Sequence, residues 1–377
     1  MGVERNIVFL ILMLLKNAYA VFCFHSPLQG FNHLKPKNRL FYSLRSQAAY
    51  LNEETWREKV WAHRKRVYEL LSPGFLRGEE RKESSDRGDS AVEFAALDPH
   101  NPIYNFLLEY YNVRGRKGTK RLARWSPGFN VRERLQLLLG GGTAADAREF
   151  QVFLENASEE DVEEALLCSK GTFVTHEEMG KRGLVYSLQE LRSADELATY
   201  NWYKSILAST AANAPVLNCY GLHEWAMQYQ PEGEPDPPSR SYQKLKLRVS
   251  QQVINDAVEQ NVVCCTHFDA LRFFAPAAKK LNKHDPSFLS RENQLLLENP
   301  ACLHSSMDLL KIAIKLSPFG EAETLADALE VSIMSRTLDV AASPYDARDY
   351  GLSPIMIETA EGKSVYKAQQ VKLFNSF

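Results

Sequence analysis

Apolar residues recur at the spacing of an α-helix through most of this chain. Trp56, Val60, Val67 and Leu71 lie on one helical face, after an Asn-Glu-Glu start that is typical of a helix N-terminus. The same period predicts helices at residues 102–111, 158–168, 187–213, 250–259, 264–280, 287–297, 302–316 and 321–340, and a last helix in the tail. The expected fold class is mostly α: a single large multi-helix domain with a few short strands.

The predicted domain covers residues 49–377 and is interrupted by non-helical segments. Residues 171–175 and the alternating residues 241–249 are expected to form short strands. Residues 231–238 are rich in proline and predict a turn-rich loop. Residues 77–90 are charged and contain no large apolar residue, which is typical of a solvated or disordered loop.

Residues 1–20 are predicted to form a signal peptide. An apolar run at 6–14 lies between Arg5 and Lys16, and Ala18-Tyr-Ala20 supplies the small-x-small end of such a leader. The run is shorter than the ~20 apolar residues that a membrane span needs, so no stable membrane insertion is expected after the leader is removed. The alternative is an N-terminal helix of the folded domain.

Residues 21–48 have the composition of a transit peptide. No Asp or Glu occurs between Glu4 and Glu53, whereas Lys, Arg and Ser are frequent. A signal peptide followed directly by such a segment resembles the two-part leader of plastid proteins in algae with secondary plastids, with Phe22 near the cleavage point. The chain is therefore expected in the plastid (chloroplast), and the alternative is the secretory pathway.

The charge of the mature chain argues against a broad nucleic-acid surface. The whole chain has 45 basic and 47 acidic residues. Residues 1–45 contain six of the basic ones and one acidic one, so 39 basic and 46 acidic residues remain, a net charge of −7. Proteins that bind nucleic acid usually carry net positive charge or a basic stripe.

The cysteines do not predict a disulfide framework. Five of the six remain once Cys23 leaves with the leader, and Cys264 and Cys265 are adjacent. An odd count without Cys-x-x-Cys spacing fits a reducing compartment and argues against a zinc finger.

Three segments each place a histidine close to a carboxylate inside an apolar run. They contain His223 with Glu224, His267 with Asp269, and His304 with Asp308. Histidine and carboxylates transfer protons and bind metals, so these six residues are the candidate catalytic set. Only His304 and Asp308, four residues apart, share a helical face. His223 and Glu224, as neighbours, are expected to point in different directions.

Each histidine segment also has a purely structural interpretation. The helix with His304 and Asp308 fits an ordinary amphipathic helix, Asp269 is spaced to pair with Arg272, and Glu224 fits the first turn of a capped helix. If the histidines are functional, His223, His267 and His304 converge on a divalent metal ion or serve as acid–base groups.

Aromatic and basic residues complete the candidate site. Trp225, Tyr229, Phe268 and Phe273 are candidates for a pocket wall or for stacking on a base. Arg121 and Arg124, in the basic segment 114–124, are candidate phosphate contacts, and the alternative is that this segment is a solvated loop.

Several longer motifs point to a known family. They are Asn101–Tyr111, Arg121–Gly128, Cys219–Met227, Thr266–Phe274 with Leu281-Asn282, Cys302–Lys311 and Ser343–Gly351. With these motifs, residues from about Trp56 to Tyr366 resemble a bacterial and algal family whose members carry the label 3-methyladenine DNA glycosylase. The resemblance implies a hydrolase of N-glycosidic bonds with damaged DNA as its partner.

The sequence thus leaves three functions open. The first is the glycosylase-like hydrolase, in which a base enters an aromatic pocket beside an acid. The second is a plastid enzyme, metal-dependent or acid–base, that acts on a small-molecule substrate through the His/Asp cluster. The third is a non-catalytic helical binding module with structural histidines.

Overall fold

The computed structural model describes residues 49–76, 93–128, 151–167, 171–178, 181–188, 194–242, 244–317 and 320–375. The predicted leader segments 1–20 and 21–48 and the charged segment 77–90 lie outside these ranges. The helices are α2 (Glu53–Leu71), η1 (Ser72–Gly74), α3 (Asn105–Tyr110), α4 (Gly115–Leu122), α6 (Glu159–Glu164), α7 (Ala194–Ala212), α8 (Leu222–Met227), α9 (Ser239–Tyr242), α10 (Gln251–Glu259), α11 (Phe268–Leu271), α12 (Pro276–Lys279), α13 (Gln294–Leu297), α14 (Leu303–Leu316), α15 (Ala322–Ala342), η3 (Arg348–Tyr350) and α16 (Ala360–Asn375).

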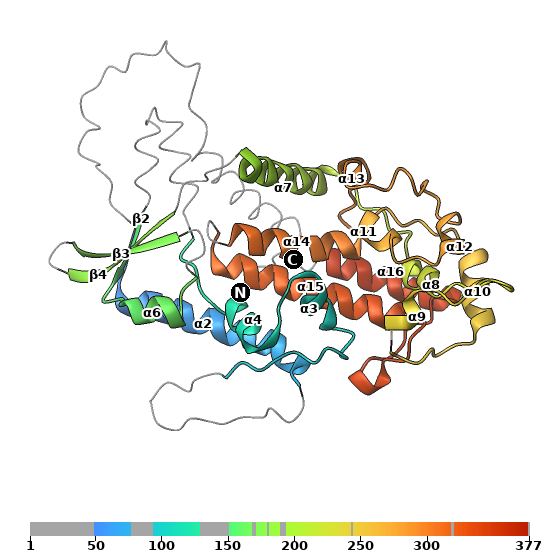
Figure 1. Cartoon of the computed structure of the whole chain (residues 1–377), viewed down its shortest axis with the longest axis horizontal. Helices are drawn as coiled ribbons and strands as arrows, with labels where there is room; N and C mark the ends of the chain where they lie inside the picture. The colour runs from blue at the N-terminus through green and yellow to red at the C-terminus, as the bar shows by residue number, and fades with distance from the viewer. Residues whose placement is uncertain are drawn as a thin grey trace, which may run out of the picture.

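The fold is mostly α, as the apolar period predicts, and the pair α14 and α15 forms its centre (Figure 1). Helices α2 and α16 both pack on α15. Most residues of α15 are buried, including the small Ala326, Ala328 and Ser332. A helix buried on nearly every side lies in the interior of a protein, so any charged residue on it needs a buried partner.

A small sheet packs beside the N-terminal part of α2. Its strands β1 (Ala49–Leu51), β2 (Gln151–Glu155), β3 (Gly171–Glu178) and β4 (Lys181–Leu188) lie in the order β1-β2-β4-β3. β1 pairs with β2 in parallel, and the other pairs are antiparallel. Trp56 and Trp125 are fully buried in a second, smaller apolar cluster under this sheet. The sheet lies at the far end of the molecule from α8, α10 and α12 (Figure 1).

Several predicted elements match the structure closely. Helix α2 begins where expected, and the side chain of Asn52 accepts a hydrogen bond from Thr55 N at 2.8 Å as its cap. Ser158 caps α6 with a reciprocal bond to Asp161. The strand predicted at 171–175 is present as the longer β3.

Other predicted elements are wrong. The described residues of the range 241–249 do not form a strand: residues 241 and 242 belong to α9, and Leu247 makes an isolated bridge with Tyr345. The basic segment 114–124 is not a loop but contains the helix α4. The helix predicted at 264–280 is broken into α11 and α12, because Pro276 forces Ala275 into an extended conformation.

Three more predicted helices have different bounds. Residues 187 and 188 belong to β4, so α7 begins only at Ala194. The helix predicted at 287–297 is reduced to α13, and that at 102–111 to α3 after a turn. In the part of the chain that the structure describes, none of these helices is long and apolar enough to span a membrane.

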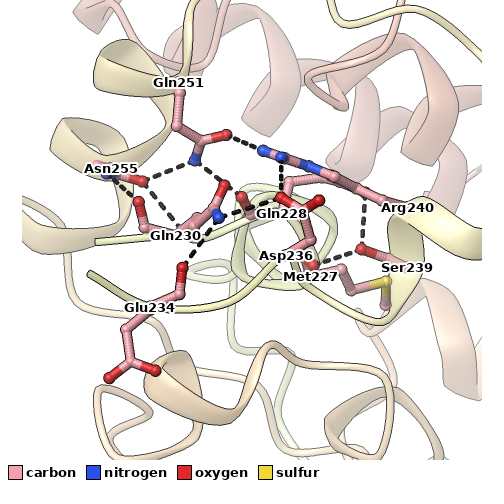
Figure 2. A network of polar contacts seen from close by, with 9 residues as sticks. All are labelled: Met227, Gln228, Gln230, Glu234, Asp236, Ser239, Arg240, Gln251 and Asn255. Atoms are coloured by element: carbon pink, nitrogen blue, oxygen red, sulfur yellow. Dashed lines mark hydrogen bonds and ion pairs between the residues drawn. The ribbon is translucent and has the colours of Figure 1, made fainter. Parts of the chain in front are cut away.

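The chain that follows α8 is fixed by a network of side-chain hydrogen bonds (Figure 2). Gln228 Nε2 donates to Ser239 Oγ at 2.8 Å, and Ser239 Oγ donates to the carbonyl of Met227 at 2.6 Å. Gln251 of α10 donates to the carbonyl of Gln228 at 2.9 Å. Because Met227 is the last residue of α8, this network holds the end of the short helix that carries His223.

Candidate functional site

Three separate segments bring His223, His267 and His304 together. His223 lies in the first turn of α8, His267 is the N-cap of α11, and His304 lies in the first turn of α14. Gly221 sets the entry to α8 with a φ of +72°, a left-handed conformation that glycine adopts without strain. A Cβ at Gly221 would also lie 3.3 Å from the Cβ of Ala342, so the chain passes close to α15 here.

The three imidazole rings form a continuous row with His304 in the middle. The His223 and His304 ring centroids are 4.6 Å apart, at an interplanar angle of 71°. The His267 and His304 rings stack at 5.2 Å and 21°. His223 and His267 are buried, at 2% and 4% exposure. A row of three imidazoles, two of them buried, is unusual for side chains that only fill space.

His267 is paired with Asp308 from the facing helix α14. The distance from His267 Nε2 to Asp308 Oδ2 is 3.1 Å, and Gln294 Nε2 donates to the same oxygen at 3.3 Å. Burial opposes the protonation of His267, but the hydrogen bond to Asp308 and its negative charge outweigh burial and raise the His267 pKa. The same pairing outweighs burial at Asp308 and lowers its pKa.

His223 is paired with Asp339 of α15, a residue that the sequence did not single out. His223 Nε2 lies 2.7 Å from Asp339 Oδ1. Although burial disfavours the charged imidazole, the Asp339 carboxylate outweighs it and raises the His223 pKa well above its usual value. At Asp339, the nearby His223 outweighs the effect of burial and lowers the pKa.

Arg336 links Glu224 to this pair. Its Nη1 lies 2.6 Å from Glu224 Oε1 and 2.7 Å from Asp339 Oδ2. Burial raises the pKa of Glu224, and Arg336 partly offsets that effect. A guanidinium between two buried carboxylates holds both in place, because each would be costly to bury alone.

His304 differs from its two neighbours because it forms no ion pair among the described residues. Burial lowers its pKa well below the usual value, and the adjacent His223 and His267 lower it further. The row therefore contains a neutral imidazole between two imidazoles that are each paired with an aspartate.

A pocket of about 620 Å³ opens beside the row of histidines. Candidates from the sequence that line it are Glu224, His267, Phe268, Asp269, Phe273, His304 and Asp308. Further aromatic rings, Phe106, Tyr110, Tyr111 and Tyr345, add to its walls, and Arg272, Arg291, Lys311 and Arg336 supply positive charge. The volume and the mixture of aromatic and charged groups are typical of a site for one small molecule.

Other candidate residues lie elsewhere or are already paired. Trp225 is fully buried and donates from Nε1 to Ala342 O at 2.9 Å. The Tyr229 hydroxyl donates to Glu259, and neither Trp225 nor Tyr229 lines the pocket. Asp269 lies 3.5 Å from Arg272, the ion pair expected from their spacing.

The two candidate phosphate contacts lie outside the pocket. Arg121 donates to Tyr111 O at 3.2 Å and Arg124 donates to Glu163 O at 3.0 Å. Arg121 is nevertheless adjacent to the pocket, because Tyr111 lines it.

Four cysteines gather behind the histidine row. With His223 and His304, they line a cavity of about 10 Å³; they are Cys219, Cys264, Cys265 and Cys302. All four are free. Burial raises the pKa of Cys302 to about 12 and raises that of Cys265 as well. Such thiols are protonated at neutral pH, and a protonated thiol is neither a good nucleophile nor a good metal ligand.

One group of potential metal ligands stands out among the described residues. One ligand atom each from His223, Glu224 and Asp339 lies within 4.8 Å of the others. The set differs from the three histidines proposed from the sequence, and it contains neighbours on a helix that were expected to point apart. Both side chains of α8 instead turn toward α15.

Sequence reasoning missed Arg336 and Asp339. Their signal is visible afterwards: two charged residues, three positions apart, in a stretch of α15 that is otherwise apolar or small. No protein-family model, curated protein or solved structure matches this chain.

Proposed function

We propose that this protein is an enzyme that acts on a small anionic molecule by acid–base catalysis in the pocket beside the histidine row. The observation that carries the proposal is the His267–Asp308 pair, at 3.1 Å, which lines an aromatic pocket of about 620 Å³. A histidine oriented by a carboxylate is a common proton-transfer group.

The hydrogen bonds of His267 suit proton transfer. Nε2 is bound to Asp308, so the carboxylate orients the ring and stabilises its protonated form. The other ring nitrogen, Nδ1, is buried and has no hydrogen-bond partner among the described residues. A proton on Nδ1 is therefore not shared with another protein group.

The charges around the pocket support an anionic substrate. Arg291 and Lys311 line it, and neither forms an ion pair with a described residue. Arg272 forms an ion pair with Asp269 at 3.5 Å. Its guanidinium also lies over the Phe273 ring, 4.7 Å from the ring centroid. Cations beside aromatic rings favour a planar or hydrophobic molecule that carries a carboxylate or phosphate.

N-glycosidic hydrolysis is a second candidate, which the aromatic lining favours. Phe268, Tyr110 and Phe273 supply rings against which a purine can pack, and Asp269 supplies a carboxylate near the sugar. The exposed cations of α4 approach the pocket through the Arg121–Tyr111 hydrogen bond. N-glycosidic hydrolysis agrees with the family resemblance. Its substrate would be DNA or a nucleoside released from DNA.

The proposal is tested by incubating the purified protein with a small-molecule extract and following each compound by mass spectrometry. Wild type is expected to consume an anionic compound, and His267→Gln is expected to lose this activity. His63→Gln is the matched control, because His63 is also buried but bonds only to Leu122 O at 3.1 Å, outside the pocket. Equal consumption by wild type and His267→Gln would refute the role of His267.

The second candidate is tested by release of 3-methyladenine from methylated DNA and from methylated nucleosides. Release from DNA that is lost in the Arg121→Glu, Arg124→Glu double variant would support a DNA glycosylase. Release from nucleosides alone would place N-glycosidic chemistry in a small-molecule enzyme. No release from either substrate would reject this candidate.

A further inference from the structure

We infer that His223, Glu224 and Asp339 form a binding site for one divalent transition-metal ion. The three residues come from two helices, α8 and α15, and each offers a ligand atom within 4.8 Å of the other two. The inference does not depend on the proposed function, since that proposal uses the His267–Asp308 pair on other elements.

His223 and Asp339 are close enough to share one ion after a small movement. His223 Nε2 and Asp339 Oδ1 are 2.7 Å apart. Both atoms are fully buried, and neither makes a hydrogen bond of acceptable geometry with a described residue. Two ligands at about 2.0–2.2 Å from one ion are about 3 Å apart at a coordination angle of 90° and about 3.4 Å apart at the tetrahedral angle, so the two atoms need to separate by only about 0.3–0.7 Å to bind one ion.

The groups around these ligands hold them in orientation. Arg336 Nη1 contacts Glu224 Oε1 and Asp339 Oδ2, which leaves Asp339 Oδ1 available to an ion. On the other side of the imidazole, His223 Nδ1 lies 3.4 Å from Cys219 Sγ. In the tautomer that donates Nδ1–H to sulfur, Nε2 carries the lone pair that a metal requires. Such outer partners are typical of metal sites in proteins.

The buried charges also favour a cation. At the site itself, Glu224 and Asp339 are two buried carboxylates, and Arg336 is a guanidinium that contacts both. One negative charge is therefore left for a bound cation or a protonated His223 to balance, and the experiment below separates these two states.

The donor set identifies the class of ion. One imidazole nitrogen and two carboxylate oxygens suit Zn²⁺, Mn²⁺, Fe²⁺ or Co²⁺, whereas Mg²⁺ and Ca²⁺ prefer oxygen alone. Among the described residues, no cysteine belongs to this group of ligand atoms, so a Co²⁺ complex is expected to lack sulfur charge-transfer absorption.

The test is a Co²⁺ titration of the chelator-treated full chain, followed by visible absorption and by the melting temperature. Wild type is expected to bind one equivalent and to melt at a higher temperature with the ion. Loss of an outer partner alone costs 10–100-fold in affinity, so Glu224→Gln and His223→Gln are expected to weaken binding by about 100-fold or more. His267→Gln, in the same histidine row, is expected to bind Co²⁺ like wild type.

Two results would overturn this assignment. One is a wild-type chain that binds no Co²⁺; the other is loss of binding in His267→Gln with retention in Glu224→Gln, which would indicate the three-histidine site instead. Because a buried variant can fail to fold, anomalous diffraction from wild-type crystals soaked in Co²⁺ gives an independent answer. The ion is expected within about 2.2 Å of His223 Nε2 and of a carboxylate oxygen from Asp339, and an ion elsewhere contradicts the inference.

Discussion

Asp308 reaches across from α14 to His267, with 3.1 Å between Oδ2 and Nε2. Its spacing had predicted a partnership with His304, one turn earlier on the same helix. In the structure His304 instead stacks on the His267 ring, at 5.2 Å. Asp308 thus pairs with His267 on the neighbouring segment, and His304 has no carboxylate partner among the described residues.

The first prediction concerns the pKa of His267. In Asp308→Asn the hydrogen bond and the negative charge that raise this pKa are both weakened, so burial dominates and the pKa falls below 6.5, the ordinary value. NMR titration of the histidine Cε1–H signals measures this change. An unchanged His267 pKa in Asp308→Asn would show that the pair is not formed.

The same pair predicts a pH-dependent contribution to stability. A raised His267 pKa means that the folded state binds the proton more tightly than the unfolded chain, whose value is near 6.5. The contribution is therefore fully present below pH 6.5 and is lost as the pH rises through the folded-state value. Urea unfolding at pH 6 and pH 9 is expected to show a larger loss for Asp308→Asn at pH 6.

Arg336 is expected to be essential for stability. Arg336→Met leaves Glu224 and Asp339 buried without their partner, and such a change typically costs about 3–5 kcal/mol. Arg116→Met is the matched control, because Arg116 is 51% exposed and pairs with Glu93, which is 46% exposed; its cost is expected at about 0–1 kcal/mol. Similar costs in urea unfolding for both variants would contradict the buried network.

The lowered pKa of His63 predicts the opposite dependence of stability on pH. Burial lowers its pKa, and the bond to Leu122 O offsets this only in part. The unfolded chain then takes up a proton more readily, so stability falls as the pH drops below 6.5. The loss of unfolding free energy caused by His63→Gln is therefore expected to be smaller at pH 5.5 than at pH 7.5, and an equal loss at both would contradict it.

The positively charged residues Arg291 and Lys311 of the pocket are expected to contribute to the affinity for an anionic substrate. Lys311→Glu and Arg291→Glu are each expected to raise KM for the consumed anion about tenfold, equivalent to about 1.4 kcal/mol. Lys315→Glu is the control, because Lys315 is exposed on the same helix but does not line the pocket. If all three variants have the same KM, the anion does not bind at these cations.

Helices with regularly recurring apolar residues were predictable from the sequence. The starts of α2 and α10 follow from the caps Asn52 and Ser250, and those of α14 and α15 from apolar residues three or four positions apart. The strand β4 was not predicted, although it forms a hairpin with β3 in which Glu178 pairs with Lys181, because its apolar run is only three residues long, Leu184 to Tyr186. The break in the helix predicted at residues 264–280 was also not predictable, since the apolar pattern continues through Pro276.

Only part of the candidate site could be predicted from the sequence. The three histidines could be found because each is polar within an apolar run. Their partners could not, because the choice of Asp339 for His223 and Asp308 for His267 depends on how α15 and α14 pack against α8 and α11. Local spacing instead favoured Glu224 and Asp269, which pair with Arg336 and Arg272.

The most direct test of the catalytic role of the His267–Asp308 pair is the turnover rate of two isosteric variants on the compound that wild type consumes. Asp308→Asn removes the charge that orients His267, and Asp327→Asn removes a mostly buried charge from the Arg66 contact on α15, outside the pocket. We predict that kcat falls about 10²–10⁴-fold in Asp308→Asn and stays at the wild-type value in Asp327→Asn. Equal kcat values for the two variants would contradict a catalytic role for the His267–Asp308 pair.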